Sequence, residues 1–86
     1  MPRICEFNGI QIYMYHDDHP WPHVHVLYAE FSAVLRIDGF ELERGKLPPR
    51  IRRLVLQWAR EFESELRENF ALAEALQPLK RVPPRR

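Results

Sequence analysis

The sequence predicts an α+β domain, in which a small, mostly antiparallel sheet of about four strands packs against one long C-terminal helix. The turn dipeptide Asn8-Gly9 between two apolar stretches and the alternation of apolar residues from His23 to Ile37 predict two hairpins. The helix is predicted by an apolar stripe that recurs at spacings of three and four residues. The members of this stripe are Ile51, Leu54, Val55, Trp58, Phe62, Leu66 and Phe70.

The first predicted hairpin joins residues 3–7 to residues 10–16. Its turn is assigned to Asn8-Gly9 because both of these residues tolerate positive φ. A two-residue turn then fixes the pairing of the strands. The expected pairs are Phe7 with Ile10, Cys5 with Ile12, and Arg3 with Met14.

The second predicted hairpin joins residues 23–28 to residues 31–37 around Ala29-Glu30, a turn without glycine that leaves a longer or bulged loop open. Side chains on a strand alternate between the two faces of a sheet. One face is expected to carry Val24, Val26, Tyr28, Phe31, Ala33 and Leu35, and this is the core side. His23 and His25 fall on the other face, with His23 opposite Arg36. We therefore expect both histidines to look outward from the sheet or into a cleft beside it.

The rest of the chain completes one domain over residues 1–79. A turn at Asp38-Gly39, a short strand at residues 40–42 and a turn at Arg44-Gly45 lead to the helix. Pro48 or Pro49 suits the first turn of this helix, which is expected to reach about Leu76 before Pro78 ends it. Residues 80–86 form a basic, proline-containing tail that we expect to be flexible.

Composition limits the classes of function. The single cysteine, Cys5, excludes an internal disulfide and a cysteine-rich zinc site, and it is expected to be buried. No apolar run approaches the ~20 residues of a membrane span, so we expect a cytoplasmic protein without membrane contact.

The net charge of +1 predicts no nucleic-acid binding by itself. A basic cluster before and at the start of the helix could meet an acidic partner or a phosphate backbone, although a solvated surface explains it as simply. Its members are Lys46, Arg50, Arg52 and Arg53.

The histidines indicate a candidate site. All four lie within one stretch of ten residues, at positions His16, His19, His23 and His25. On a strand, His23 and His25 would point the same way with Cα atoms about 6.5 Å apart. Such a pair could perform acid–base chemistry on RNA, with one imidazole taking the 2′-hydroxyl proton and the other protonating the leaving oxygen. The candidate catalytic residues are therefore His23 and His25, with His19 as their loop partner and Arg36 as a phosphate contact.

Two other interpretations of the histidines stay open. The alternative ligand set for a transition metal is His19, His23, His25 and Asp18, although no cofactor is required and the metal cannot be named. In the other interpretation the histidines are structural or interfacial, and they hydrogen-bond loop carbonyls around the Pro-Trp-Pro crossing.

A family resemblance rests on the same stretch. Its specific part is the motif Asp18-His19-x-x-Pro22-His23-x-His25-x-x-Tyr28-x-Glu30, and a weaker part is Gly45-Lys46-Leu47-Pro48. In these residues the chain resembles the small bacterial family catalogued as domain of unknown function 4160. The sequence departs from the pattern at Trp21, where the family usually has a second proline, and at His16, where it tends to have an aromatic residue.

The resemblance implies no established activity, but it implies a setting. Members of the family look like partners in two-gene modules of the toxin–antitoxin kind. The expected function is therefore that of a module component, which binds a small protein encoded by a neighbouring gene and acts on RNA through the histidine cluster. The alternative is a non-catalytic regulatory module that binds protein, RNA or DNA, or pairs with a second copy of itself, through an open sheet face or edge strand. The resemblance adds Tyr28 and Glu30 to the residues of interest.

Overall fold

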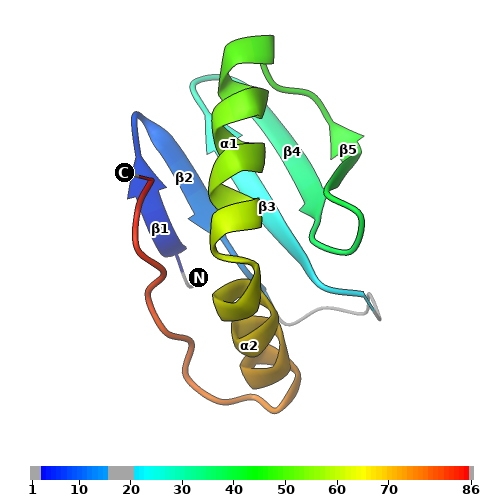
Figure 1. The fold of residues 1–86 in the computed structure, drawn as a ribbon, viewed down its shortest axis with the longest axis vertical. Helices are drawn as coiled ribbons and strands as arrows, with labels where there is room; N and C mark the ends of the chain where they lie inside the picture. The colour runs from blue at the N-terminus through cyan, green and yellow to red at the C-terminus, as the bar shows by residue number, and fades with distance from the viewer. Residues whose placement is uncertain (1–2, 16–20, 86) are drawn as a thin grey trace.

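The computed structural model describes residues 3–15 and 21–85, which form a five-stranded antiparallel sheet and two helices (Figure 1). The strands lie side by side in chain order, as β1 (Arg3–Phe7), β2 (Ile10–Tyr13), β3 (His23–Tyr28), β4 (Phe31–Arg36) and β5 (Glu41–Gly45). The helices are α1 (Pro49–Glu61) and α2 (Glu63–Glu74). The α+β class is confirmed, with one strand more than expected and with the predicted helix divided in two.

The first hairpin follows its prediction up to a bulge near the start of β1. Asn8 and Gly9 form the turn with φ angles of 51° and 77°. Two of the predicted pairs are confirmed, namely Phe7 with Ile10 and Cys5 with Ile12. The third is wrong, because the register shifts before Cys5 and Arg3 then faces Tyr13 instead of Met14. The bulge lets two successive residues, Ile4 and Cys5, both enter the core.

The second hairpin has the predicted register throughout, from the pair of His23 and Arg36 to the pair of Tyr28 and Phe31. Ala29 takes the glycine-like conformation of the tight turn, with φ of 51°. β5 runs on through the segment that we expected to turn. Its last residue, Gly45, packs so closely on β4 that a Cβ atom there would overlap the Ser32 carbonyl oxygen.

The predicted single helix bends at Phe62, whose φ and ψ are −110° and 30°. The hydrogen-bond ladder continues across the bend, since the Phe62 N–H donates to Trp58 and the Leu66 N–H donates to Phe62, both at 3.0 Å. Residues of the apolar stripe on both sides of the bend are buried, including Val55 before it and Phe70 after it. The bend therefore changes the direction of the helix without taking its apolar side off the sheet. No helix in the described part of the chain is long and apolar enough to cross a membrane.

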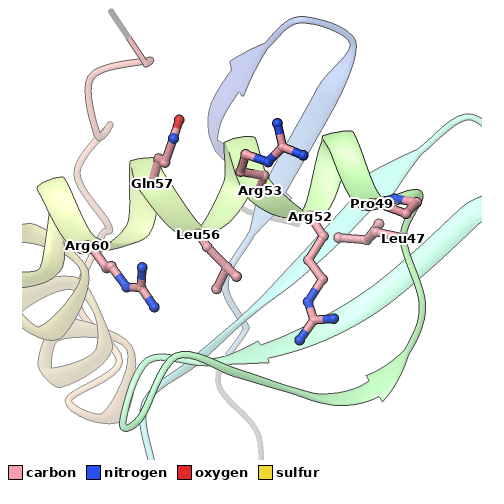
Figure 2. Close-up of a pocket in the computed structure, with 7 residues that line it drawn as sticks. All are labelled: Leu47, Pro49, Arg52, Arg53, Leu56, Gln57 and Arg60. Carbon is pink, nitrogen blue, oxygen red and sulfur yellow. The ribbon is translucent and has the colours of Figure 1, made fainter.

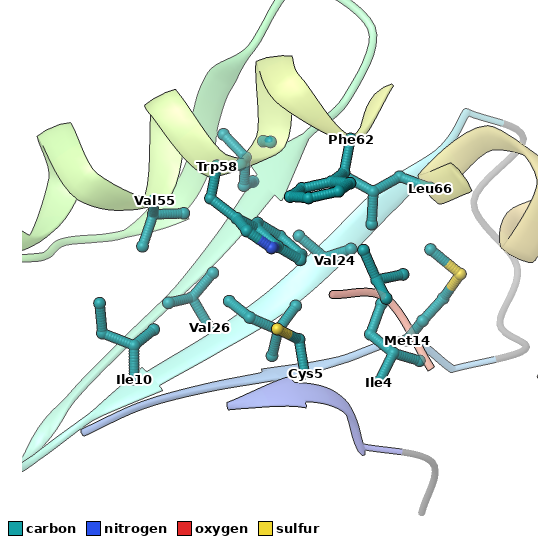
Figure 3. Close-up of a cluster of buried hydrophobic side chains, with 14 of the residues drawn as sticks. Ile4, Cys5, Ile10, Met14, Val24, Val26, Val55, Trp58, Phe62 and Leu66 are labelled. Carbon is teal, nitrogen blue, oxygen red and sulfur yellow. The ribbon is translucent and has the colours of Figure 1, made fainter. Parts of the chain in front are cut away.

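The core lies between α1 and the sheet, with the Trp58 ring near its centre (Figure 3). The Trp58 ring lies 5.7 Å from Phe7 and 6.3 Å from Phe62, measured between ring centroids. Trp58 and Phe62, both members of the predicted apolar stripe, are buried in this core. Cys5 is buried in the same cluster, as its apolar neighbourhood predicted.

The C-terminal segment, which was expected to be a flexible tail, contacts the domain through Val82 and Pro83. The Val82 N–H donates to the Ile4 carbonyl at 2.8 Å, and the Val82 side chain is 3% exposed. The indole N–H of Trp58 donates to the Pro83 carbonyl at 2.8 Å. A buried indole needs an acceptor and the edge of β1 needs a partner, and this segment supplies both (Figure 1).

Candidate functional site

The face of the sheet away from α1 and α2 carries the candidate site. Both helices lie on one side of the sheet in Figure 1, and no described element covers the other side. Side chains on this second side alternate with buried core residues and are half-buried or exposed. We call this surface the open face, and its members are Gln11, Tyr13, His25, Leu27, Ser32, Val34 and Arg36.

His25 lies at the middle of the open face. It faces Tyr13 on β2 and Val34 on β4, and it is half-buried. The Tyr15 ring meets the imidazole edge-on, with centroids 4.5 Å apart and an interplanar angle of 82°. Tyr13 stacks on Tyr15 at 6.1 Å and 6°. Burial, and to a lesser extent the neighbouring Tyr13, raises the pKa of the Tyr15 hydroxyl. We call Tyr13, Tyr15 and His25 the aromatic row, in which the two tyrosine rings hold the imidazole in place.

His23 does not share this exposure. It was expected to look outward with His25, but it is only 1% exposed. His23 is the first residue of β3. The Phe70 ring of α2 packs against its imidazole, with ring centroids 6.0 Å apart and an interplanar angle of 64°. The Nδ1 atom lies 3.0 Å from the Trp21 carbonyl oxygen, so this nitrogen carries the proton and donates it. The outward prediction is therefore right for His25 and wrong for His23.

Arg36 lies across from His23 and extends towards Trp21. Its guanidinium carbon is 4.6 Å from the centre of the Trp21 ring, a cation–π contact. The Trp21 indole donates to Glu43 at 3.2 Å, and Asp38 lies 3.6 Å from the guanidinium. The Arg36 Nε atom is buried without a hydrogen-bond acceptor in residues 3–15 and 21–85. The guanidinium group is thus held against the Trp21 ring and close to the Asp38 carboxylate.

The metal interpretation is not tested by the geometry. Within the described ranges, no three histidine, cysteine, aspartate or glutamate residues lie close enough to hold an ion. Two of the proposed ligands, Asp18 and His19, lie outside the described residues, as does His16. The role of His19 as a loop partner and the alternative ligand set therefore stay predictions.

Tyr28 and Glu30 are not part of the same site. Tyr28 lies at the far end of β3, on the core side, where its ring packs near Gly9. Glu30 is exposed in the turn between β3 and β4. The contacts within the aromatic row were not predicted from the sequence, although alternation along β2 places Tyr13 and Tyr15 on the same side. A shallow hollow of about 90 Å³ over β3, β4 and β5 was not predicted either. It is lined by His25, Leu27, Ser32, Ala33, Val34, Arg44 and Gly45.

A family model described as a domain of unknown function, DUF4160, matches residues 9–71. The chain belongs to this family. The part that matches DUF4160 runs from the first turn into α2, so it includes His25, Arg36 and the whole open face of β3 and β4. No curated protein and no solved structure matches the chain.

Proposed function

We propose that the protein is one component of a two-gene module of the toxin–antitoxin kind, and that it binds a partner protein over the open face of its sheet. The observation that carries this proposal is the chemistry of the open face. The solvent side of an antiparallel sheet is ordinarily polar. Here the centre of that side is occupied by His25, Leu27 and Val34, and Leu27 is 37% exposed.

The arrangement suits a protein interface. Aromatic side chains and arginine are enriched at the centres of interfaces, where they give contact area at a low cost in conformational entropy. The rings of the aromatic row, which includes His25, contact one another, and the Tyr13 hydroxyl donates to Gln11 at 2.9 Å. A partner would therefore meet a largely preformed surface, which reduces the entropy that binding removes.

The second candidate is action on RNA, and the position of His25 beside Arg36 on one face favours it. Histidine exchanges protons near neutral pH, and a guanidinium group contacts phosphate. The burial of His23 makes a mechanism with two exposed imidazoles a poor fit to the structure. In this proposal His25 moves the proton, His19 is its predicted partner, and Arg36 contacts the phosphate.

Expression in a bacterial host, with and without the neighbouring gene, tests both candidates. We expect the protein or its neighbour to arrest growth alone, and co-expression to restore growth. RNA action predicts degraded bulk RNA during arrest and intact RNA with His25→Ala. Arrest with intact RNA supports partner binding alone. Normal growth in every combination would contradict the module assignment.

A further inference from the structure

A pocket of about 340 Å³ lies along one flank of α1, apart from the open face (Figure 2). Leu47 and Leu56 are its aliphatic part, and Arg52 and Arg60 extend from the helix on the same flank (Figure 2). The complete lining is Leu47, Pro49, Arg52, Arg53, Leu56, Gln57 and Arg60. We call this pocket the α1 groove.

The α1 groove is rich in positive charge that the described chain does not neutralise. No acidic residue lies in the first turn of α1. Among residues 3–15 and 21–85, the ion pairs involve other cations, and none joins a carboxylate to Arg52, Arg53 or Arg60. Arg60 instead lies over the Phe40 ring, 5.6 Å from its centre. An acidic ligand would complement these guanidinium groups.

The spacing of the groove matches an extended peptide. Arg52, Leu56 and Arg60 are four residues apart on one flank of α1, so they recur about every 6 Å along the helix. Alternate side chains of a β-strand recur about every 6.6 Å on one side of the strand. Successive side chains on one side of a strand can therefore meet the three positions in turn, as an acid, an aliphatic residue and an acid.

The sheet has one covered edge and one uncovered edge. The C-terminal segment covers β1, where Val82 bonds to Ile4. At the other edge, β5 is the outermost strand, and no described segment pairs with its free side. An unpaired edge offers a row of backbone donors and acceptors to an added strand. In Figure 2 the side chains of Arg52, Leu56 and Arg60 extend from α1 on the side where this strand lies.

We propose that the α1 groove and the edge of β5 together bind an extended acidic segment of a partner protein, with the pattern Glu-x-Leu-x-Glu. The segment adds to β5 as a further strand. Its two acidic side chains meet Arg52 and Arg60, and its leucine meets Leu56. The intervening residues face the other side of the sheet, which carries both Glu41 and Arg44 at this edge, so they are uncharged.

The same features favour a peptide over a nucleic acid. A phosphate backbone would use the arginines but would leave the aliphatic part of the groove without a partner. It also has no amide groups to pair with the edge of β5. This surface is separate from the open face, so the proposal does not depend on the function proposed above.

Fluorescence anisotropy of a labelled seven-residue peptide, Thr-Glu-Thr-Leu-Thr-Glu-Thr, with the full chain tests the proposal. We expect saturable binding that weakens as salt rises. The double variant Arg52→Glu/Arg60→Glu should weaken it about tenfold or more, since two attractions become repulsions. The matched control is Arg81→Glu, an exposed arginine beside the opposite edge of the sheet, which should leave binding unchanged. Both arginines of the double variant are exposed, so the fold should be kept, and circular dichroism checks this.

Two further probes test the added strand itself. Only alternate residues of an added strand turn their backbone groups to the sheet. Of two peptides, one N-methylated at odd positions and the other at even positions, one should lose binding and the other should keep it. Equal binding of the two, equal binding by the double variant, or displacement of the peptide by an eight-nucleotide oligouridylate at lower concentration would overturn the proposal. Self-association of the chain that the double variant abolishes would overturn it as well, because the occupant would then be a second copy.

Discussion

The rings of His23 and His25 lie 5.5 Å apart between centroids, yet only His25 reaches the surface. His23 is closed in by Phe70 and bonded to the Trp21 carbonyl, whereas His25 stands in the aromatic row of the open face. Two residues that the motif presents as equivalent therefore have different physical roles. His23 stabilises the start of β3, and His25 contributes its ring to the open face.

Replacing the two histidines should separate these roles. His23→Ala removes a buried ring and leaves the Trp21 carbonyl without its donor, so we expect a loss of about 2–3 kcal/mol in the free energy of unfolding. His25→Ala removes a half-buried ring and should cost about 1 kcal/mol or less. Urea denaturation of both variants measures the difference. Equal losses would contradict the assignment.

Removal of residues 80–86 should destabilise the domain rather than trim a loose end. The truncation exposes the edge of β1, leaves the Trp58 indole without its acceptor and removes the buried Val82 side chain. We expect a loss of about 3 kcal/mol in the free energy of unfolding, followed by tryptophan fluorescence in urea. The control is Arg85→Ala, whose contact with Gln57 is exposed and should matter by less than about 0.5 kcal/mol. An unchanged midpoint in the truncated chain would contradict the packing.

Gly39 and Gly45 both have positive φ, and alanine substitutions at the two positions test how closely β5 packs on β4. At Gly45, with φ of 79°, an added Cβ would also overlap the Ser32 carbonyl oxygen. At Gly39, with φ of 93°, an added Cβ meets nothing within 4 Å. Gly39→Ala should therefore cost only the backbone strain of about 1–2 kcal/mol, and Gly45→Ala should cost at least about 3 kcal/mol or prevent folding. Thermal unfolding of both variants tests this order, and the reverse order would contradict the close approach of β5 to β4.

Ionisation of the Cys5 thiol should lower the free energy of unfolding at alkaline pH. Burial raises the pKa of this thiol above its ordinary value of 9.0, although the Glu6 backbone, Arg81 and Trp58 act in the opposite direction. The folded state then holds the proton more tightly than the unfolded chain does. The resulting stabilisation is present below about pH 9 and is lost as pH rises through the higher folded pKa.

Urea denaturation of the wild type and of Cys5→Ala at pH 8 and pH 10.5 measures this effect. The Cys5→Ala variant should lose less stability between the two pH values, since it has no thiol to ionise. Tyr15, whose pKa is also raised by burial, is common to both proteins and serves as the shared background. An equal loss in the two proteins would show that the thiol does not contribute.

The elements with strong local patterns were predictable from the sequence. Turn chemistry and alternation predicted both hairpins, including the register that places His23 opposite Arg36. The burial of His23 was not predictable, because it depends on Phe70, a residue from a distant helix whose direction is set by the bend at Phe62. The order of the C-terminal segment likewise depends on a buried Trp58 that needs an acceptor, and no local pattern in the tail indicates this.

The central claim is that the open face binds the product of the neighbouring gene. Isothermal titration calorimetry of that product with wild type, Leu27→Asp and Leu76→Asp tests it most directly. Leu27 is 37% exposed on the open face, and Leu76 is 76% exposed just after α2, so both variants should fold. We expect Leu27→Asp to weaken binding about tenfold or more and Leu76→Asp to leave it unchanged. Equal affinity of the three proteins, or no binding by the wild type, would contradict the claim.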